Sequence, residues 1–260
     1  MTKGRALVTG GARRLGRAMA LHLAGRGIDV AIHYASSRGE AEETVADLRA
    51  LGVRAEAIQA DLLVENDTRR LVPAAASALG GPLTVLINNA SIFEYDNIRT
   101  GTRQSWDRHI ESNLRAPVAL SQDFAAQAPE EDWGGAEPVA SSLIVNLLDQ
   151  RVLKLTPEFM SYSIAKMGLW AFTRTAAQAL GPRIRVNAIG PGPTLIGARQ
   201  SETHFAAQRA STVLNRGADP SDITAALGYL LDARAVTGQL ICVDGGQHLA
   251  WQTPDILGVD

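Results

Sequence analysis

The sequence predicts an α/β fold, with one domain over residues 1–260 built on a doubly wound parallel sheet of about seven strands with helices on both faces. Three observations predict it. Short runs rich in Val, Ile and Leu recur along the chain, helical stretches separate them, and a glycine-rich turn follows the first run. Continuous apolar runs are typical of strands that are buried on both faces of a parallel sheet.

The apolar runs predict seven strands, in order along the chain. They lie at residues 5–9, 28–33, 53–59, 83–87, 142–148, 184–189 and 239–243. Between the second and third, "RGEAEETVADLRALG" places Ala41, Val45 and Leu48 on one helix face, with Gly52 as a stop. Residues 128–141 are rich in Pro, Gly and acidic residues, so we expect an exposed loop before the fifth strand.

Composition limits the function classes. The net charge of -2 lacks the excess of positive charge that is typical of nucleic-acid-binding proteins, and no apolar run is long enough to span a membrane. Cys242 is the lone cysteine, and the five histidines have no metal-ligand spacing, so neither a disulfide nor a metal site is expected. The chain enters its first strand without a signal-like segment, which favours a cytoplasmic protein.

The stretch "VTGGARRLG" forms the first strand-to-helix turn. Thr9, Gly10, Gly11 and Gly16 would let the backbone approach a pyrophosphate, whose charge the free N–H groups at a helix N-terminus favour. This pattern predicts a Rossmann-type dinucleotide site. The alternative is a glycine turn that only packs the helix onto the strand.

The end of the second strand predicts the form of the dinucleotide. "IHYASSRGE" places Ser36, Ser37 and Arg38 where an acidic residue would favour NADH, and Arg13 lies in the neighbouring loop. Hydroxyls and cations suit a ribose 2′-phosphate, so we predict NADPH/NADP as cofactor. A solvated polar loop is the alternative. Asp61 would accept from the adenine amino group, or else cap the next helix.

A tyrosine and a lysine on one helix face predict the chemistry. Tyr162 and Lys166 are four residues apart in "SYSIAKMGLWAF", so their side chains are neighbours. A nearby ammonium favours the phenolate and would lower the pKa of Tyr162, which would make it an acid/base near neutral pH. An unremarkable pair on a helix surface is the alternative.

Taken together, these motifs resemble the short-chain dehydrogenase/reductase family along essentially the whole chain. Further matches are "NNA" at 88–90, "ESNLRAP" around Asn113, "RVNAIGPGP" at 185–193 and "VTGQLICVDGG" at 236–246. The resemblance implies hydride transfer with Tyr162 as acid/base, Lys166 on the nicotinamide ribose, and Asn113 holding a water. It also implies a homotetramer. The cofactor-binding residues that it implies, beyond Tyr162 and Lys166, are Gly10, Arg13, Arg14, Leu15, Gly16, His33, Tyr34, Ser36, Ser37, Arg38, Asp61, Leu62, Asn89, Ala90, Ser91, Pro191, Gly192 and Thr194.

Two departures from the general family pattern favour one subgroup. Arg14 replaces the middle glycine of the turn, and Asp149 stands where a serine usually precedes the tyrosine by 13 residues. An ionised aspartate only accepts hydrogen bonds and would oppose a developing alkoxide, so it suits a substrate with N–H donors. Both substitutions occur in pteridine reductases, which "NNASIF" also resembles. This subgroup implies that Phe93 stacks on a pterin and that Arg14 contacts both phosphate and substrate.

The sequence therefore predicts an NADPH-dependent reductase of a small pterin-like substrate. Hydride passes to a ring carbon, Tyr162 protonates the adjacent nitrogen, and residues 193–216 close over the substrate. Phe93 as a core aromatic and Asp149 as a turn residue are the alternatives. Three other functions stay open: a carbonyl or 3-oxoacyl reductase, a nucleotide-binding module without catalysis, and a structural subunit of an assembly.

Overall fold

The computed structural model describes residues 4–197 and 200–251. Its seven strands form one parallel sheet in the order β3-β2-β1-β4-β5-β6-β7. All seven predicted strands are confirmed, with ends that shift by up to two residues. Their bounds are β1 Arg5–Val8, β2 Asp29–Tyr34, β3 Ala55–Gln59, β4 Val85–Asn88, β5 Ser142–Leu147, β6 Ile184–Pro191 and β7 Leu240–Val243.

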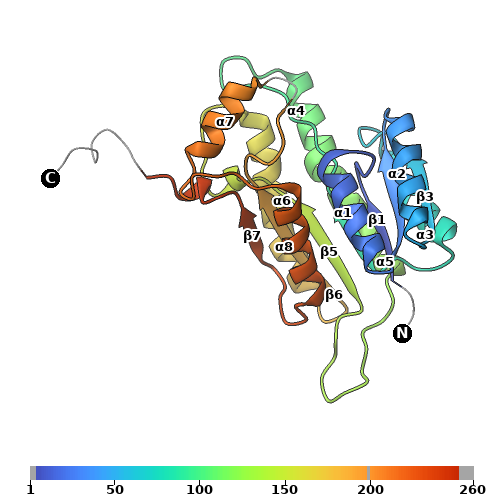
Figure 1. Ribbon diagram of the computed structural model, residues 1–260. Helices are drawn as coiled ribbons and strands as arrows, with labels where there is room; N and C mark the ends of the chain where they lie inside the picture. The colour runs from blue at the N-terminus through green and yellow to red at the C-terminus, as the bar shows by residue number, and fades with distance from the viewer. Residues whose placement is uncertain (1–3, 198–199, 252–260) are drawn as a thin grey trace.

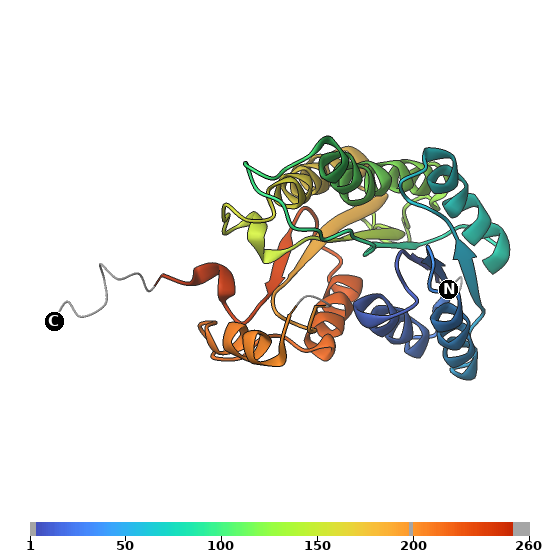
Figure 2. The same cartoon turned by 90° about the horizontal axis from the view of Figure 1, so that it is seen from above.

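Helices cover both faces of the sheet (Figure 2). The helices α1 (Arg14–Gly25), α2 (Arg38–Ala50) and α8 (Pro220–Asp232) share one apolar cluster with one face. The opposite face packs against α3 (Glu65–Leu79), α5 (Ala116–Gln127) and α6 (Met160–Leu180). These two clusters bury both sides of the central strands, which is why the strands read as continuous apolar runs.

The helix α2 shows how local pattern becomes packing. Ala41, Val45 and Leu48 are buried as predicted, while the charged residues of the same helix face solvent. The predicted loop at 128–141 is also observed, and a single antiparallel bridge between Asp132 and Val139 closes it. None of the helices in the described part of the chain is both long and apolar enough to cross a membrane.

The strand order reverses between β1 and β4, so the crevice at their carboxyl ends is the expected ligand position in an open α/β sheet. The helices α4 (Arg103–Ile110) and α7 (Glu202–Ala210) lie toward the same end of the molecule in Figure 1, but Figure 2 shows them on opposite sides of the sheet. Three short helices complete the fold: the π-helix η1 (Glu111–Arg115) and the 3-10 turns η2 (Gln150–Val152) and η3 (Gln247–Leu249).

Candidate active site

The glycine turn after β1 is fastened to the end of β4. Thr9 Oγ1 accepts from the backbone N–H groups of Asn89 and Ala90 at 2.9 and 3.0 Å, and the Asn89 amide donates to the Thr9 carbonyl at 2.8 Å. A Cβ added at Gly16 would lie 2.1 Å from the Gly10 carbonyl oxygen. Only glycine at this position lets the turn fold so tightly over the start of α1, which leaves a backbone cradle for a phosphate.

The side chain of His33 supports the same glycine turn through a hydrogen bond to its backbone. The ring is 3% exposed, its Nδ1 accepts from the Gly10 N–H at 3.1 Å, and its Nε2 donates to the Ala60 carbonyl at 3.0 Å. Burial lowers the pKa of His33, so the neutral tautomer that makes both bonds is favoured. His33 therefore links the glycine turn to the end of β3, and its ring nitrogens face protein atoms.

Arg14 occupies the position where glycine is usual with a φ of 53°, in the left-handed region. Its guanidinium donates to the Ile196 carbonyl at 2.9 Å and to the Leu195 carbonyl at 3.1 Å. These residues follow β6 and begin the segment 193–216. The structure thus places Arg14 between the phosphate turn and the expected substrate-binding segment, and its predicted contacts with phosphate and pterin stay predictions.

The residues expected around a 2′-phosphate form an exposed rim after β2. Ser36 and Arg38 are exposed and Ser37 is partly buried, while Arg13 lies nearby and approaches Glu40 at 3.9 Å. The rim presents hydroxyls and two cations to solvent, as a phosphorylated ribose requires.

Three other predicted cofactor residues point into protein. Tyr34 and Leu15 pack into the cluster beneath α1, and Leu62 is 8% exposed. Asp61 is exposed, and its Oδ1 accepts from the Leu63 N–H at 2.9 Å. This bond stabilises a turn ahead of α3. The N-cap of α3 is Val64, so Asp61 does not cap that helix, and its contact with the adenine stays a prediction.

The central pair of the site is Tyr162 and Asp149. The Tyr162 hydroxyl donates to Asp149 Oδ2 at 3.0 Å, and Asp149 Oδ1 accepts from the Arg151 N–H at 2.9 Å. Burial raises the pKa of Asp149, and burial together with the Asp149 charge raises the pKa of Tyr162 well above its ordinary value. The tyrosine therefore holds its proton at neutral pH and faces an acceptor.

The prediction that Lys166 lowers the pKa of Tyr162 is wrong for this structure. Lys166 Nζ donates to the Leu147 carbonyl at 2.7 Å and lies 5.7 Å from the centroid of the Tyr162 ring. Desolvation of the phenol and the Asp149 charge dominate instead. Burial also lowers the pKa of Lys166 to about 8. Near that pH part of the population carries a neutral amine, which has less electrostatic effect on Tyr162.

Asn113 and Ser91 organise the strand end that faces Tyr162. Asn113 Oδ1 accepts from the Ile92 N–H, and its Nδ2 donates to the Ile92 carbonyl, both at 2.8 Å. Ser91 contributes a side-chain hydrogen bond to Tyr162. The side chain of Asn113 thus positions the segment that carries Phe93, and its predicted water contact stays a prediction.

Phe93 lies beside the Tyr162–Asp149 pair in an aromatic group that includes a residue missed by the sequence analysis. Its ring is 4.7 Å from the Tyr162 ring, edge to face, and stacks on Phe159 at 4.3 Å with an interplanar angle of 15°. Phe93 is 44% exposed, so it is not a core aromatic. Phe159 precedes α6 with a φ of 58°, and no local sequence pattern indicates that conformation.

A buried chain of hydrogen bonds beneath these rings was also missed. His109 Nδ1 contacts Ser161 Oγ at 2.7 Å, and the Ser161 hydroxyl donates to Asp96. His109 Nε2 accepts from the Glu94 N–H at 3.1 Å. The network ties the loop after Phe93 to the start of α6, and its members come from three distant segments, so spacing in the sequence gave no sign of it.

The segment after β6 packs against the residues that follow β7. A Cβ at Gly192 would lie 2.6 Å from Asp244 Cα, and the Thr194 hydroxyl donates to the Gly192 carbonyl at 3.1 Å. Within the expected mobile segment 193–216, α7 buries none of its side chains. Residues 198–199 of this segment lie outside the described part of the chain, as do residues 252–260.

Comparisons with known proteins show which family the chain belongs to. The family model described as Enoyl-(Acyl carrier protein) reductase matches residues 10–248. The 3-oxoacyl-[acyl-carrier-protein] reductase FabG of Staphylococcus aureus (strain N315) is 32% identical over 254 residues, which cover 96% of this chain and 99% of that protein.

Solved structures extend the comparison. FolM alternative dihydrofolate reductase 1 from Brucella canis, complexed with NADP, is 44% identical with a TM-score of 0.88 and 98% coverage of both chains. The reductase LugOII, described as catalysing keto-reduction at C1 during lugdunomycin biosynthesis, is 30% identical with a TM-score of 0.85, and the match covers 95% of this chain and 98% of that one. The chain belongs to the short-chain dehydrogenase/reductase family and is an oxidoreductase of that family.

Proposed function

We propose that this protein reduces a dihydropterin with NADPH. The observation that carries the proposal is the Tyr162 hydroxyl donating to Asp149 at 3.0 Å. A carboxylate beside the acid would oppose a developing alkoxide but would accept the N–H groups of a pterin ring. The similarity to the FolM enzyme of Brucella canis, named an alternative dihydrofolate reductase, supports the same substrate class.

The residues around the glycine turn fit NADPH. The backbone cradle at Gly10 and Gly16 would hold the pyrophosphate, and the exposed rim at Ser36, Arg38 and Arg13 would hold the 2′-phosphate. The cofactor supplies the hydride when bound. Pro191, Gly192 and Thr194 would border the nicotinamide, and Ala90 and Ser91 would line it from β4, as the family resemblance implies.

Proton delivery would fall to Tyr162. Its raised pKa keeps the phenol protonated at neutral pH, so it can donate to a ring nitrogen as the adjacent carbon is reduced. Asp149 orients the phenol by accepting from it, and the buried ammonium of Lys166 lies behind the Tyr162 ring. The pterin would stack on Phe93, whose ring is 44% exposed, and segment 193–216 would close over it.

Asp149→Ser tests this function. We expect it to lower kcat/KM for dihydropterins by about tenfold to a hundredfold, because a hydrogen bond to a charged group is lost at the site. The measurement is NADPH oxidation with dihydrobiopterin, dihydromonapterin and dihydrofolate. Unchanged or faster pterin reduction by the variant would contradict the role of Asp149, and a wild type inert toward all three would remove the proposed function.

A ketoreductase is the second candidate, and specific relatives favour it. The FabG protein of Staphylococcus aureus is named for a 3-oxoacyl substrate, and LugOII for keto-reduction. A panel of ketones and 3-oxoacyl thioesters, assayed beside the dihydropterins, separates the two. Higher kcat/KM on the ketones, with Asp149→Ser improving them further, would favour this second function.

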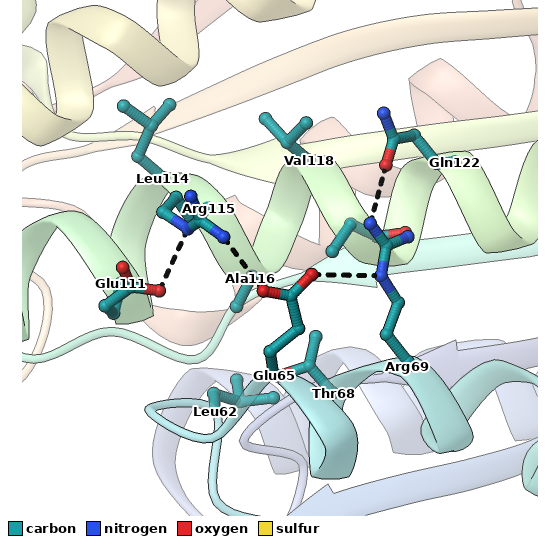
Figure 3. A pocket seen from close by; sticks show the side chains of 11 residues that line it. Leu62, Glu65, Thr68, Arg69, Glu111, Leu114, Arg115, Ala116, Val118 and Gln122 are labelled. Carbon is teal, nitrogen blue, oxygen red and sulfur yellow. Dashed lines mark hydrogen bonds and ion pairs between the residues drawn. The ribbon is translucent and has the colours of Figure 1, made fainter.

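We also propose that the protein is a homotetramer and that the outer face of α5 and α6 forms one of its interfaces. Ile164 and Met167 are 43% and 37% exposed on α6, an apolar surface on a helix that otherwise packs on the sheet. Beside it lies a groove of about 260 Å³ between α3 and α5, with Leu114 and Val118 in its lining (Figure 3). The charged groups along this groove pair with one another, among them Glu65 with Arg115 at 2.9 Å.

A further inference from the structure

A cation lies at the edge of the site and has no part in the chemistry described above. The Arg151 guanidinium is partly buried, and it makes no ion pair within 4.0 Å to any residue of 4–197 or 200–251. Its Nη1 donates to Thr156 Oγ1 at 3.0 Å, and its Cζ lies 5.0 Å from the centroid of the Phe159 ring. A guanidinium carries five N–H donors, so this arrangement leaves donors for a ligand.

Arg151 is close enough to act on the site. Its backbone N–H donates to Asp149 Oδ1 at 2.9 Å. Burial raises the pKa of both Asp149 and Tyr162, and the positive charge of Arg151 opposes that rise in each. The acidic Glu158 nearby is engaged in a side-chain hydrogen bond with Tyr95.

Phe159 connects this cation to the expected substrate position. Arg151 covers the Phe159 ring, which stacks in turn on Phe93 at 4.3 Å. Phe159 has a φ of 58°, a strained conformation for a bulky residue and one that is found preferentially at active and ligand sites. The guanidinium therefore lies about one ring beyond Phe93, within reach of a chain that extends from a bound ring system.

We propose that Arg151 binds an anionic group on the substrate's tail, so that the site selects a pterin extended by carboxylates, as in dihydrofolate, over one with a neutral side chain. This inference rests on the proposed pterin reduction. A planar guanidinium pairs with a carboxylate through two parallel N–H bonds, and here the adjacent phenyl ring holds that plane.

Arg151→Gln tests the inference, with Arg234→Gln as the matched control. Arg234 is exposed after α8, so the control removes the same charge away from the site. The measurement is KM and kcat for dihydrofolate, which is anionic, and for dihydrobiopterin, which is neutral, with NADPH saturating. We expect Arg151→Gln to raise the KM for dihydrofolate about tenfold or more and to leave that for dihydrobiopterin within about threefold.

The two substrates separate a tail contact from a general effect. Because Arg151 also acts on Asp149, we expect Arg151→Gln to change kcat by the same factor for dihydrofolate and for dihydrobiopterin. Only the KM for dihydrofolate should rise selectively. Arg151→Lys should recover part of the dihydrofolate affinity. Equal KM changes for both pterins, or none for dihydrofolate, would overturn the inference alone. A wild type that reduces neither pterin would overturn the proposed function and this inference with it.

Discussion

The buried carboxylate of Asp149 serves the proposed reaction but lowers the stability of the folded state. It holds a buried negative charge against the phenol of Tyr162, and desolvation raises the pKa of its carboxyl group. The folded state therefore binds the proton more tightly than the unfolded state does. Stability consequently falls as pH rises from the ordinary carboxyl value of 3.8 through the raised pKa, and it stays reduced above that.

Asp149→Asn removes this charge with little change of shape. We expect the variant to melt at a higher temperature than wild type at pH 7, by about 2–4 °C for each kcal/mol gained, while pterin turnover falls. The difference in Tm should grow as pH rises from about 4 to 7, because only the wild type ionises at this position. Calorimetry across that range measures it, and a difference independent of pH would contradict the buried-charge explanation.

At the scale of elements, the turn after β1 and the segment after β6 are joined by one side chain. Arg14 adopts a left-handed backbone conformation, and its guanidinium donates hydrogen bonds to the carbonyls of Leu195 and Ile196. The backbone strain costs about 1–3 kcal/mol, and two charge-assisted hydrogen bonds offset it. The phosphate turn and the segment expected over the substrate are therefore mechanically coupled.

Arg14→Gly should release that segment. We expect amide hydrogen exchange at Leu195–Gly197 to accelerate at least about tenfold, because the two hydrogen bonds are lost while the turn itself is relieved of strain. Arg13→Gly is the matched control, since Arg13 approaches Glu40 rather than the segment. Equal exchange rates in wild type and Arg14→Gly would show that Arg14 does not hold this segment.

At the scale of the whole molecule, exposed apolar side chains on α6 support the proposed homotetramer. Ile164 and Met167 leave an apolar surface on α6, on the sheet face opposite α2. Contacts of this kind exclude water when two copies pack together, and a charge placed there would be buried without a partner.

Met167→Glu should therefore reduce the sedimenting species from a tetramer to a dimer or monomer. Ala46→Glu, which adds the same charge at an exposed position of α2 on the other face, should leave the tetramer intact. Sedimentation velocity distinguishes the species. A wild type that sediments as a monomer, or a tetramer unaffected by Met167→Glu, would contradict this interface.

The sequence by itself determined the strands, their parallel arrangement and the glycine turn. Burial on both faces requires continuous apolar residues, and a tight turn requires glycine, so both features are visible in the local sequence. It also indicated Tyr162 and Lys166 through their spacing on one helix face, and Asp149 through the resemblance to the family. Only the tertiary structure decided that desolvation and Asp149 outweigh Lys166 at the phenol, that Phe159 stacks on Phe93, and that Arg151 lies over that stack. Burial and through-space charge depend on segments distant in the chain, so no local pattern could fix them.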